Sequence, residues 1–152
     1  MSDLRISTRT EEVDFSVVFR FLSHESYWAK GISEARLRRA IANSICVSAF
    51  RGDAQVGFAR VVTDRATFAY LCDVFVDERE RGAGVGKALV AAAIAHPDLT
   101  ALRRWLLATR GAHGLYAKFG FTQLLRPDVF MELFVDEPYR KFLFGESAEP
   151  VP

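Results

Sequence analysis

Residues 74–89 read Val-Phe-Val-Asp-Glu-Arg-Glu-Arg-Gly-Ala-Gly-Val-Gly-Lys-Ala-Leu, and the rest of the chain is interpreted around them. An apolar strand leads into charged residues, then into three glycines at alternate positions, then into a helix-forming run. A loop with so little side chain at the start of a helix lets backbone N–H groups approach an anion closely. Arg81 and Lys87 bracket the glycines and add positive charge. The stretch therefore predicts a binding site for a phosphate-bearing ligand.

Length and composition indicate one globular domain. The chain has 152 residues, of which 50% are apolar and 26% are charged, and a mass of 17.1 kDa. We expect a single domain over residues 1–144 and a flexible tail over residues 145–152. The formal net charge of +1 gives no general attraction to nucleic acid or to an acidic membrane surface. Any anion site must therefore be local.

Signals for targeting, membrane insertion and metal binding are missing from the sequence. No apolar run reaches the roughly 18 residues of a membrane span, and the first residues lack the apolar core of a signal peptide, so a cytoplasmic protein is expected. Cys46 and Cys72 lie in apolar, strand-like runs without the spacing of a metal site or a disulfide framework. We interpret them as buried free thiols and expect no metal.

Hydrophobic periodicity predicts a mixed α+β domain. Period-two patterns indicate strands over residues 4–8, 45–51, 54–63, 67–76, 102–109, 121–125 and 129–135. Helical spacing indicates helices over residues 14–24, from residue 33, over 85–96 and over 112–119. Short links make residues 45–76 an antiparallel meander, whereas a helical crossover makes strand 102–109 parallel to the strand before it. The pattern thus predicts a βαβ unit near the middle of the chain.

Several interpretations of the glycine loop compete. It could be a tight turn without a ligand, its glycines serving only close packing of strand and helix. A dinucleotide-binding Rossmann site needs Gly-x-Gly-x-x-Gly after the first strand of a doubly wound fold, whereas this loop reads Gly-x-Gly-x-Gly and follows a meander. A Walker-type phosphate loop, Gly-x-x-x-x-Gly-Lys-Ser/Thr, is excluded by the same spacing.

The remaining interpretation rests on two motifs that resemble the GNAT superfamily of acyl-CoA-dependent N-acyltransferases. Arg81-Gly82-Ala83-Gly84-Val85-Gly86 matches its Gln/Arg-x-x-Gly-x-Gly/Ala loop, and Leu71-Cys72-Asp73-Val74-Phe75-Val76 before it looks like the family's central strand. Leu115-Tyr116-Ala117-Lys118-Phe119-Gly120-Phe121 is similar to its Leu/Phe-Tyr-x-Lys-x-Gly-Phe segment. The resemblance is clearest over residues 45–125. It implies a GNAT-like α+β fold, with a mixed, mostly antiparallel twisted sheet of about six to seven strands and about four flanking helices.

The resemblance also implies where coenzyme A binds. Its pyrophosphate would lie on the loop and helix start formed by Arg81, Gly82, Ala83, Gly84, Val85, Gly86 and Lys87. In the family, pantetheine lies along the central strand like an added strand, which implies main-chain contacts with Val74, Phe75 and Val76. Thr109 stands where the family often has an asparagine and is the expected second anchor. The family splays the neighbouring strands apart, as a β-bulge often does, but no residue of this sequence marks a bulge.

Candidate catalytic residues follow from the same resemblance. Tyr116 stands where the family commonly has a tyrosine that protonates the departing sulfur; alternatively, its hydroxyl only contacts CoA. Asp73 is the only carboxylate in the core of the central strand and is the candidate base, with an equal alternative as a partly buried structural residue. Glu132 is the reserve base. The N–H of Val74 is the expected donor to the acyl carbonyl.

On the acceptor side, the expected lining residues are Tyr27, Trp28, Tyr70, Phe130 and Glu132. Tyr27 and Trp28 are the best of these, because adjacent aromatic residues in a loop cannot both easily face the core. Arg60 is a further polar candidate. A carboxylate-lined site would suit an amine, whereas a site containing Arg60 would suit an amino acid or another anion.

These residues predict an N-acetyltransferase that uses acetyl-CoA and a primary amine of a small molecule, by direct attack, since no cysteine lies in an activating setting. The alternatives are a non-catalytic acyl-CoA-binding module and an enzyme that acetylates protein N-termini or lysines. The acceptor and the length of the acyl chain are left open. The apolar residues Tyr139, Phe142, Leu143 and Phe144 indicate either a homodimer surface or a cover for the domain's own core.

Overall fold

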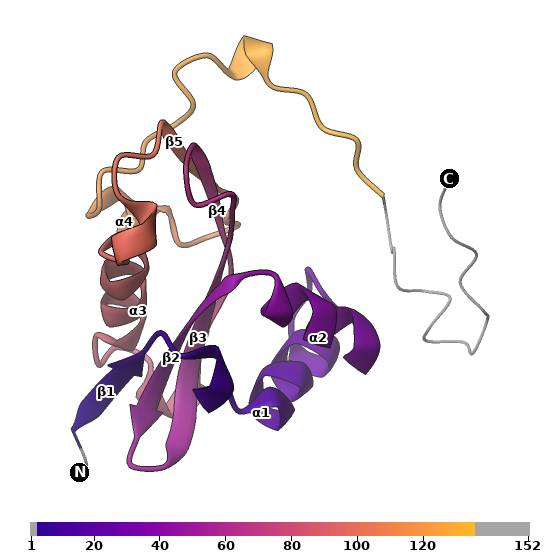
Figure 1. Ribbon diagram of the computed structural model, residues 1–152, viewed down its shortest axis with the longest axis vertical. Helices are drawn as coiled ribbons and strands as arrows, with labels where there is room; N and C mark the ends of the chain where they lie inside the picture. The colour runs from indigo at the N-terminus through magenta and orange to yellow at the C-terminus, as the bar shows by residue number, and fades with distance from the viewer. Residues whose placement is uncertain (1–2, 136–152) are drawn as a thin grey trace.

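Five strands form one sheet in the order β1-β2-β3-β4-β5 in the computed structural model, which describes residues 3–135 (Figure 1). The strands are β1 Leu4–Ser7, β2 Ile45–Arg51, β3 Ala54–Thr63, β4 Phe68–Val76 and β5 Arg104–Leu107. The first four strands pair antiparallel, whereas β4 and β5 pair parallel. The expected mixed, mostly antiparallel sheet is therefore confirmed.

Within residues 3–135, four α-helices cover the two faces of the sheet (Figure 1). They are α1 Phe15–Arg20 and α2 Glu34–Ala42 on one face, and α3 Val85–Ile94 and α4 His113–Ala117 on the other. A π-helical turn, Phe21–Glu25, prolongs α1. Asp14 and Ser33 cap α1 and α2, because the side chain of each accepts a hydrogen bond from the backbone N–H three residues further on, at 3.3 and 3.2 Å.

Strand periodicity separates the core into two clusters, one on each face of the sheet. Alternate side chains of β2 and β3 pack against α3, where Leu89 is fully buried. Cys46 and Phe58 face the other way and belong to the cluster that contains Leu22. Burial raises the pKa of the Cys46 thiol to about 11 and that of the Cys72 thiol to about 12. Both cysteines are free, as predicted, but only Cys46 is buried, whereas Cys72 is partly buried.

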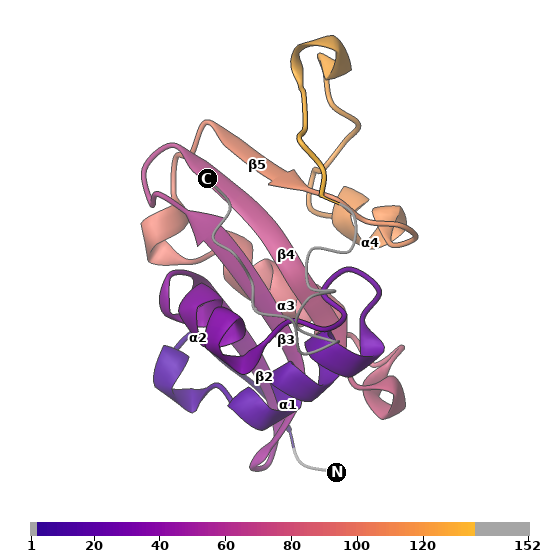
Figure 2. The ribbon, with the colours of Figure 1, turned by 90° about the vertical axis from the view of Figure 1, so that its right-hand side faces the viewer.

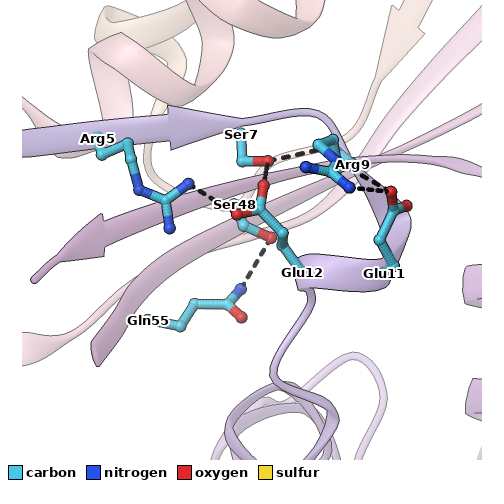
Figure 3. Close-up of polar contacts among 7 residues, drawn as sticks. All are labelled: Arg5, Ser7, Arg9, Glu11, Glu12, Ser48 and Gln55. Atoms are coloured by element: carbon cyan, nitrogen blue, oxygen red, sulfur yellow. Dashed lines mark hydrogen bonds and ion pairs between the residues drawn. The ribbon is translucent and has the colours of Figure 1, made fainter. Parts of the chain in front are cut away.

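Polar side chains fasten the N-terminal segment to the sheet, as Figure 3 shows. Gln55 is buried on β3; it donates a hydrogen bond to the Ser48 hydroxyl at 3.2 Å and accepts one from the backbone N–H of the α1 N-cap residue at 2.7 Å. Glu12 accepts hydrogen bonds from Ser7 and from Arg5. The bond from Ser7 is the first cause that holds the pKa of Glu12 below its usual value. These contacts fix how the chain enters α1.

The sheet ends with Leu107 of β5, and the strands predicted over residues 121–125 and 129–135 are wrong for the described chain. The backbone there is irregular except for a 3-10 turn at Pro127–Val129, and it extends away from the sheet (Figures 1 and 2). A strand needs a neighbouring strand for its N–H and C=O groups, and no segment of residues 3–135 pairs with this one. The described sheet therefore has five strands, fewer than expected.

Two other elements are shorter than predicted. β5 covers only the middle of residues 102–109, because β4 lies beside it only over Phe68 to Leu71. The helix predicted over residues 112–119 forms only as α4. The expected tail and the apolar residues Tyr139, Phe142, Leu143 and Phe144 lie outside the described residues. None of the helices between residues 3 and 135 is long and apolar enough to span a membrane.

Candidate functional site

The glycine loop adopts a conformation that requires glycine at two positions. Gly82 has a φ of 79° and Gly84 a φ of 82°, in the left-handed region that other residues enter at a cost. A Cβ atom at either position would meet no atom within 4 Å, so the space in front of the loop is open. An ion pair between Arg51 on β2 and Glu80, with 3.1 Å between Nε and Oε2, fastens the approach to the loop.

Helix α3 begins directly after this loop with an uncapped N-terminus. Gly84 is its N-cap residue, and no side chain caps it. The first N–H groups of a helix have no intrahelical partner, and the helix dipole adds positive potential there. Val85, Gly86 and Lys87 supply these N–H groups, while the side chains of Arg81 and Lys87 are exposed beside them. The arrangement fits a pyrophosphate.

Gly86 brings three predicted segments together. A Cβ atom at this position would lie 3.6 Å from Leu115 Cδ2 on α4 and 3.7 Å from Val76 Cγ2 on β4. Both distances are ordinary van der Waals contacts, so a methyl group at this position would touch both elements at once. The glycine loop, the end of β4 and the helix that carries Tyr116 are therefore parts of one site.

The second half of β4 lacks a neighbour on the side of β5. The parallel pairing ends at Leu71, but β4 continues to Val76. Residues 72–76 thus present main-chain groups along an edge that no strand of the described chain covers, and the predicted pantetheine contacts all lie in this stretch. The side chain of Phe75 stacks on Phe21 with 4.0 Å between ring centroids. A ligand along this edge would therefore contact Phe75 through its main chain.

A β-bulge bends β4 in the same stretch. Its register with β3 slips between Phe58 and Arg60, so the single residue between them faces two residues of β4, Asp73 and Val74. Asp73 has a φ of 52°, which a short polar side chain tolerates better than most. Sequence reasoning did not locate this bulge. One acidic residue inside an apolar strand is the signal that could have done so.

Asp73 is also the centre of a buried polar network. Its Oδ1 accepts a hydrogen bond from Trp28 Nε1 at 2.9 Å, and its Oδ2 accepts one from Arg60 Nε at 2.7 Å. Arg60 Nη1 donates to Ser44 Oγ at 3.0 Å. Only 8% of the Asp73 side chain and 17% of the Arg60 side chain are exposed. Burial is the largest single influence on the pKa of Arg60 and lowers it, but the charge of Asp73, the hydrogen bond to Asp73 and the nearby Cys72 and Cys46 together outweigh burial, so the pKa is raised.

This network bears on two predicted roles. Arg60, a candidate for binding the acceptor, is engaged with Asp73. A base role for Asp73 stays a prediction, but both of its oxygens already accept hydrogen bonds, which favours the structural alternative. Its partners are the side chains of Trp28 and Arg60, whereas the structural alternative expected nearby backbone.

Tyr116 lies on α4 and is buried, with 8% of its surface exposed. The helix ends in a Schellman motif: the Phe121 N–H donates to the Tyr116 carbonyl, and the Gly120 N–H donates to the Ala117 carbonyl. Gly120 has the required positive φ, 91°, and the Phe121 ring packs edge-on against the Tyr116 ring at 6.1 Å. Burial first, and the nearby Tyr27 second, raise the pKa of Tyr116. The spacing of the Tyr-x-x-x-Gly-Phe motif therefore sets the ring in place.

A wide hollow of about 1360 Å³ opens beside β5, α4 and the segment that follows α4. Several predicted site residues line it together, namely Tyr70, Thr109, Tyr116, Phe130 and Glu132. A second cavity of about 360 Å³ lies at the far end of β4 and is lined by Arg81 among others. The hollow is large enough for a ligand and carries both aromatic and polar side chains.

Tyr27 and Trp28 do not line this hollow; they lie in the loop between α1 and α2, and both are exposed, at 56% and 40%. The expectation that they do not both face the core is confirmed. The Arg110 guanidinium, after β5, covers the Tyr27 ring with 3.8 Å from Cζ to the centroid. The loop is thus held from two sides, by Arg110 and by Asp73.

The sequence model described as "Acetyltransferase (GNAT) family" matches residues 15–121. The chain belongs to this family. The matched span contains the glycine loop, the uncovered half of β4 and Tyr116, so the resemblance carried by the two motifs is confirmed.

Solved structures agree with this GNAT assignment. An acetyltransferase of the GNAT family from Xanthomonas campestris pv. campestris is 49% identical, with 91% of this chain and 98% of that chain covered and a TM-score of 0.88. A Trypanosoma brucei acetyltransferase is 26% identical (88% and 100% covered, TM-score 0.61). Glucosamine-6-phosphate N-acetyltransferase from Arabidopsis thaliana is 14% identical (89% and 100% covered, TM-score 0.63) and shares the fold. No curated protein matches the sequence.

Within this GNAT fold, the remaining polar candidates are placed as follows. Thr109 Oγ1 accepts a hydrogen bond from the Ala112 N–H at 3.1 Å and so helps to start α4, while its own hydroxyl proton is available to donate. His113 and Lys118 are exposed on α4 and the turn after it. Over residues 3–135, no group of three or more His, Cys, Asp or Glu side chains could hold a metal ion.

Proposed function

We propose that this GNAT protein transfers the acetyl group of acetyl-CoA to the primary amine of a small molecule by direct attack. One observation carries the proposal: the uncapped start of α3, preceded by left-handed Gly82 and Gly84, adjoins the stretch of β4 that no described strand covers. The first feature suits an anion, and the second suits an extended chain with amide groups. Coenzyme A carries a pyrophosphate and an amide-containing arm in that order.

The chain's own groups would bind and orient this substrate, which brings an acetyl group activated as a thioester. The N–H groups of the first turn of α3 would donate hydrogen bonds to the pyrophosphate, with Arg81 and Lys87 beside it. The uncovered main chain of β4 would hold the pantetheine arm as an added strand. At the bulge, the Val74 N–H would donate to the acyl carbonyl as negative charge develops on it.

Tyr116 is the proposed acid that protonates the departing sulfur. Its burial supports this role, because a raised pKa keeps the phenol protonated at neutral pH. Transfer from a phenol, with an ordinary pKa of about 10, to a thiolate, whose acid has a pKa of about 8.5, is near balance. The proton acceptor for the amine stays a prediction, with Asp73 and Glu132 as candidates; Glu132 is exposed at the hollow, whereas Asp73 is engaged with Arg60.

The hollow beside Tyr116 is the proposed acceptor site. Tyr70 and Phe130 would contribute aromatic walls and Glu132 a negative charge, which suits an ammonium group. Tyr27 and Trp28 would border it from the neighbouring loop. The width of the hollow also favours a second candidate acceptor, a lysine or N-terminus of a protein, since an open groove admits a peptide.

Two measurements test the proposal. Calorimetry measures binding of CoA and acetyl-CoA, and a thiol-detecting assay with mass spectrometry measures acetyl transfer to amines, amino sugars, amino acids and lysine peptides. We expect CoA binding and transfer to at least one amine, with acetyl-CoA preferred over longer acyl-CoA. Tight CoA binding without transfer to any amine, and without an effect of Tyr116→Phe, would instead establish a non-catalytic binding module.

A further inference from the structure

The segment that leads into the glycine loop is acidic. Residues 77–81 read Asp-Glu-Arg-Glu-Arg, so three negative charges stand against two positive charges directly before Gly82. Such charges act on a bound anion without touching it, because electrostatic interactions at physiological salt persist over a Debye length of about 8 Å. A site for a pyrophosphate at this place therefore needs a means of offsetting the carboxylates beside it.

Glu80 is the acidic residue nearest to the glycines in the sequence. It directly precedes Arg81, and its backbone carbonyl accepts a hydrogen bond from the Ala83 N–H at 3.4 Å. Only 17% of its side chain is exposed, whereas Glu78 is an exposed residue. Water therefore screens the charge of Glu80 less than the charge of Glu78.

Arg51 on β2 neutralises this carboxylate. Its Nε lies 3.1 Å from Glu80 Oε2, and only 19% of its side chain is exposed. By contrast, the pair of Arg65 and Asp98 at the surface has side chains that are 53% and 49% exposed. The charges of Arg51 and Glu80 therefore cancel in a setting with little solvent, and the carboxylate is held towards β2.

The hairpin of β2 and β3 also holds both ends of the segment by contacts that carry no charge. At its start, the Asp77 N–H donates to the Val56 carbonyl at 2.7 Å. At its end, a Cβ atom on Gly57 would lie 3.1 Å from Val85 Cγ1, so the first turn of α3 is seated directly on β3. The backbone of the glycine loop is thus fixed at two places other than the ion pair, which leaves the ion pair an electrostatic role.

We propose that Arg51 is a positioning residue for the anion cradle, which consists of the glycine loop and the first turn of α3, and that it sets the cradle's affinity for a pyrophosphate through Glu80. With Glu80 paired, the charges of Arg81 and Lys87 dominate at the cradle. With Glu80 unpaired, its carboxylate would repel the ligand. The loop motif does not reveal this residue, because Arg51 lies 29 positions before Glu80, on another strand.

A role in cancelling charge differs measurably from a role in holding the loop in place. If Arg51 cancels the charge of Glu80, its loss weakens binding only while Glu80 keeps its carboxylate, and removal of both charges restores binding. If the pair only holds the loop, loss of either partner weakens binding to the same extent, and the double variant does not recover. The inference rests on the proposed function only for the choice of CoA as the ligand.

A double-mutant cycle on the full chain tests the proposal. Calorimetry gives the Kd of CoA for the natural protein, Arg51→Met, Glu80→Gln and the double variant. We expect the Kd to rise about five- to tenfold for Arg51→Met, to rise by no more than about twofold for Glu80→Gln, and to return to within about twofold of the natural value in the double variant. The effect of Arg51→Met should shrink at high salt. The matched control is Arg65→Met, which also removes one positive charge from an ion pair and should leave the Kd unchanged.

The single variants keep the proposal open to refutation. Arg51→Lys retains the positive charge without the guanidinium, and it should bind CoA within about twofold of the natural protein. An unchanged Kd for Arg51→Met overturns the proposal, and so does a double variant that binds as weakly as Arg51→Met. Glu80→Gln is decisive by itself: a Kd that rises five- to tenfold or more in this variant overturns the proposal even where Arg51→Met fails to fold.

A second ligand separates this inference from the proposed acetyl transfer. The same four proteins are titrated with inorganic pyrophosphate, and the amide chemical shifts of residues 82–87 report binding. Pyrophosphate binding in the expected order without CoA binding supports the role of Arg51 and overturns the use of acetyl-CoA. CoA binding in the expected order without acetyl transfer supports the role of Arg51 and overturns only the proposed catalysis. Binding of neither ligand overturns both proposals.

Discussion

Asp73 and Arg60 form a buried ion pair, with 2.7 Å between Oδ2 and Nε, at the bulge just beyond the point where β5 stops covering β4. The carboxylate belongs to β4 and the guanidinium to β3, and Trp28 adds a third element by donating to the same carboxylate. A buried pair contributes little net stability compared with apolar residues of the same shape, but the loss of one partner is costly. We infer that the pair mainly fixes the geometry of the site.

The first prediction concerns the loss of this charge. Asp73→Asn retains an acceptor for Trp28 and a side chain that tolerates the left-handed backbone, but it leaves Arg60 buried without its counter-charge. We expect the free energy of unfolding in urea to fall by about 3–5 kcal/mol. The control is Asp98→Asn, because Asp98 pairs with Arg65 at the surface, and there we expect a loss of about 0–1 kcal/mol.

The same variant separates the two roles of Asp73. A positioning residue should affect stability and the KM of the amine, whereas a general base should lower kcat by about 10²–10⁴-fold even where the variant is fully folded. Folded Asp73→Asn with a rate loss of that size and a lost pH dependence would make Asp73 the base. A near-normal kcat would remove it from that role.

The second prediction concerns the loop that Asp73 holds. Trp28→Phe keeps a ring beside Tyr27 and Phe21 but removes the N–H that donates to Asp73. A hydrogen bond to a charged group contributes about 1.5–3 kcal/mol, and we expect the low end because Trp28 is 40% exposed. The KM of the amine should rise several-fold while CoA affinity stays constant. A weaker CoA affinity with an unchanged amine KM would contradict the placement of this loop on the acceptor side.

The third prediction concerns the anion cradle. Arg81→Glu places a negative charge beside the first turn of α3, and we expect the Kd of CoA to rise at least tenfold, which corresponds to about 1.4 kcal/mol. The matched control is Arg79→Glu on the neighbouring 3-10 turn, an exposed position outside the glycine loop. Calorimetry at low and high salt should show the Arg81 effect shrinking with ionic strength. Equal effects of the two reversals would remove the loop-specific role of Arg81.

Local signals explain what could be predicted from the sequence. The start of a helix is determined by residues a few positions away, such as Ser33 before α2 and the glycines before α3. Both helices therefore begin where the pattern predicts them. Strands depend on a distant partner. Residues 129–135 are an apolar run of the length of a strand, but no described segment pairs with them, and the pattern alone predicted too many strands.

Some features of the candidate site could likewise be predicted from the sequence, and others could not. The glycine loop and the Tyr116 motif are each a short, unbroken stretch of sequence, so the spacing of the residues within each motif determines its local geometry. The pairing of Asp73 with Arg60 depends on a slipped register, and the bond from Trp28 crosses 45 positions in the sequence. Neither follows from residue spacing, because a bulge of one residue changes which side chains face each other.

The fourth prediction concerns Tyr116 as the acid. Tyr116→Phe removes one hydroxyl and keeps the ring that packs against Phe121, so the fold and CoA affinity should be retained while kcat falls by about 10²–10⁴-fold. The phenol donates only while it holds its proton. Because burial, and secondarily Tyr27, raise the pKa of Tyr116, the natural enzyme should keep its kcat up to the ordinary tyrosine pKa of about 10 and lose it above that value.

Tyr27→Phe isolates the contribution of Tyr27, the smaller of the two causes that raise the pKa of Tyr116. The variant removes the charge that Tyr27 develops at high pH but leaves the burial of Tyr116, so the alkaline loss of kcat should move to lower pH by less than the whole shift. Circular dichroism at each pH separates this effect from unfolding. If kcat of Tyr116→Phe equals that of the natural enzyme, or if its alkaline limb is unchanged, the departing sulfur takes its proton from another donor, and Tyr116 serves only to shape the hollow and contact CoA.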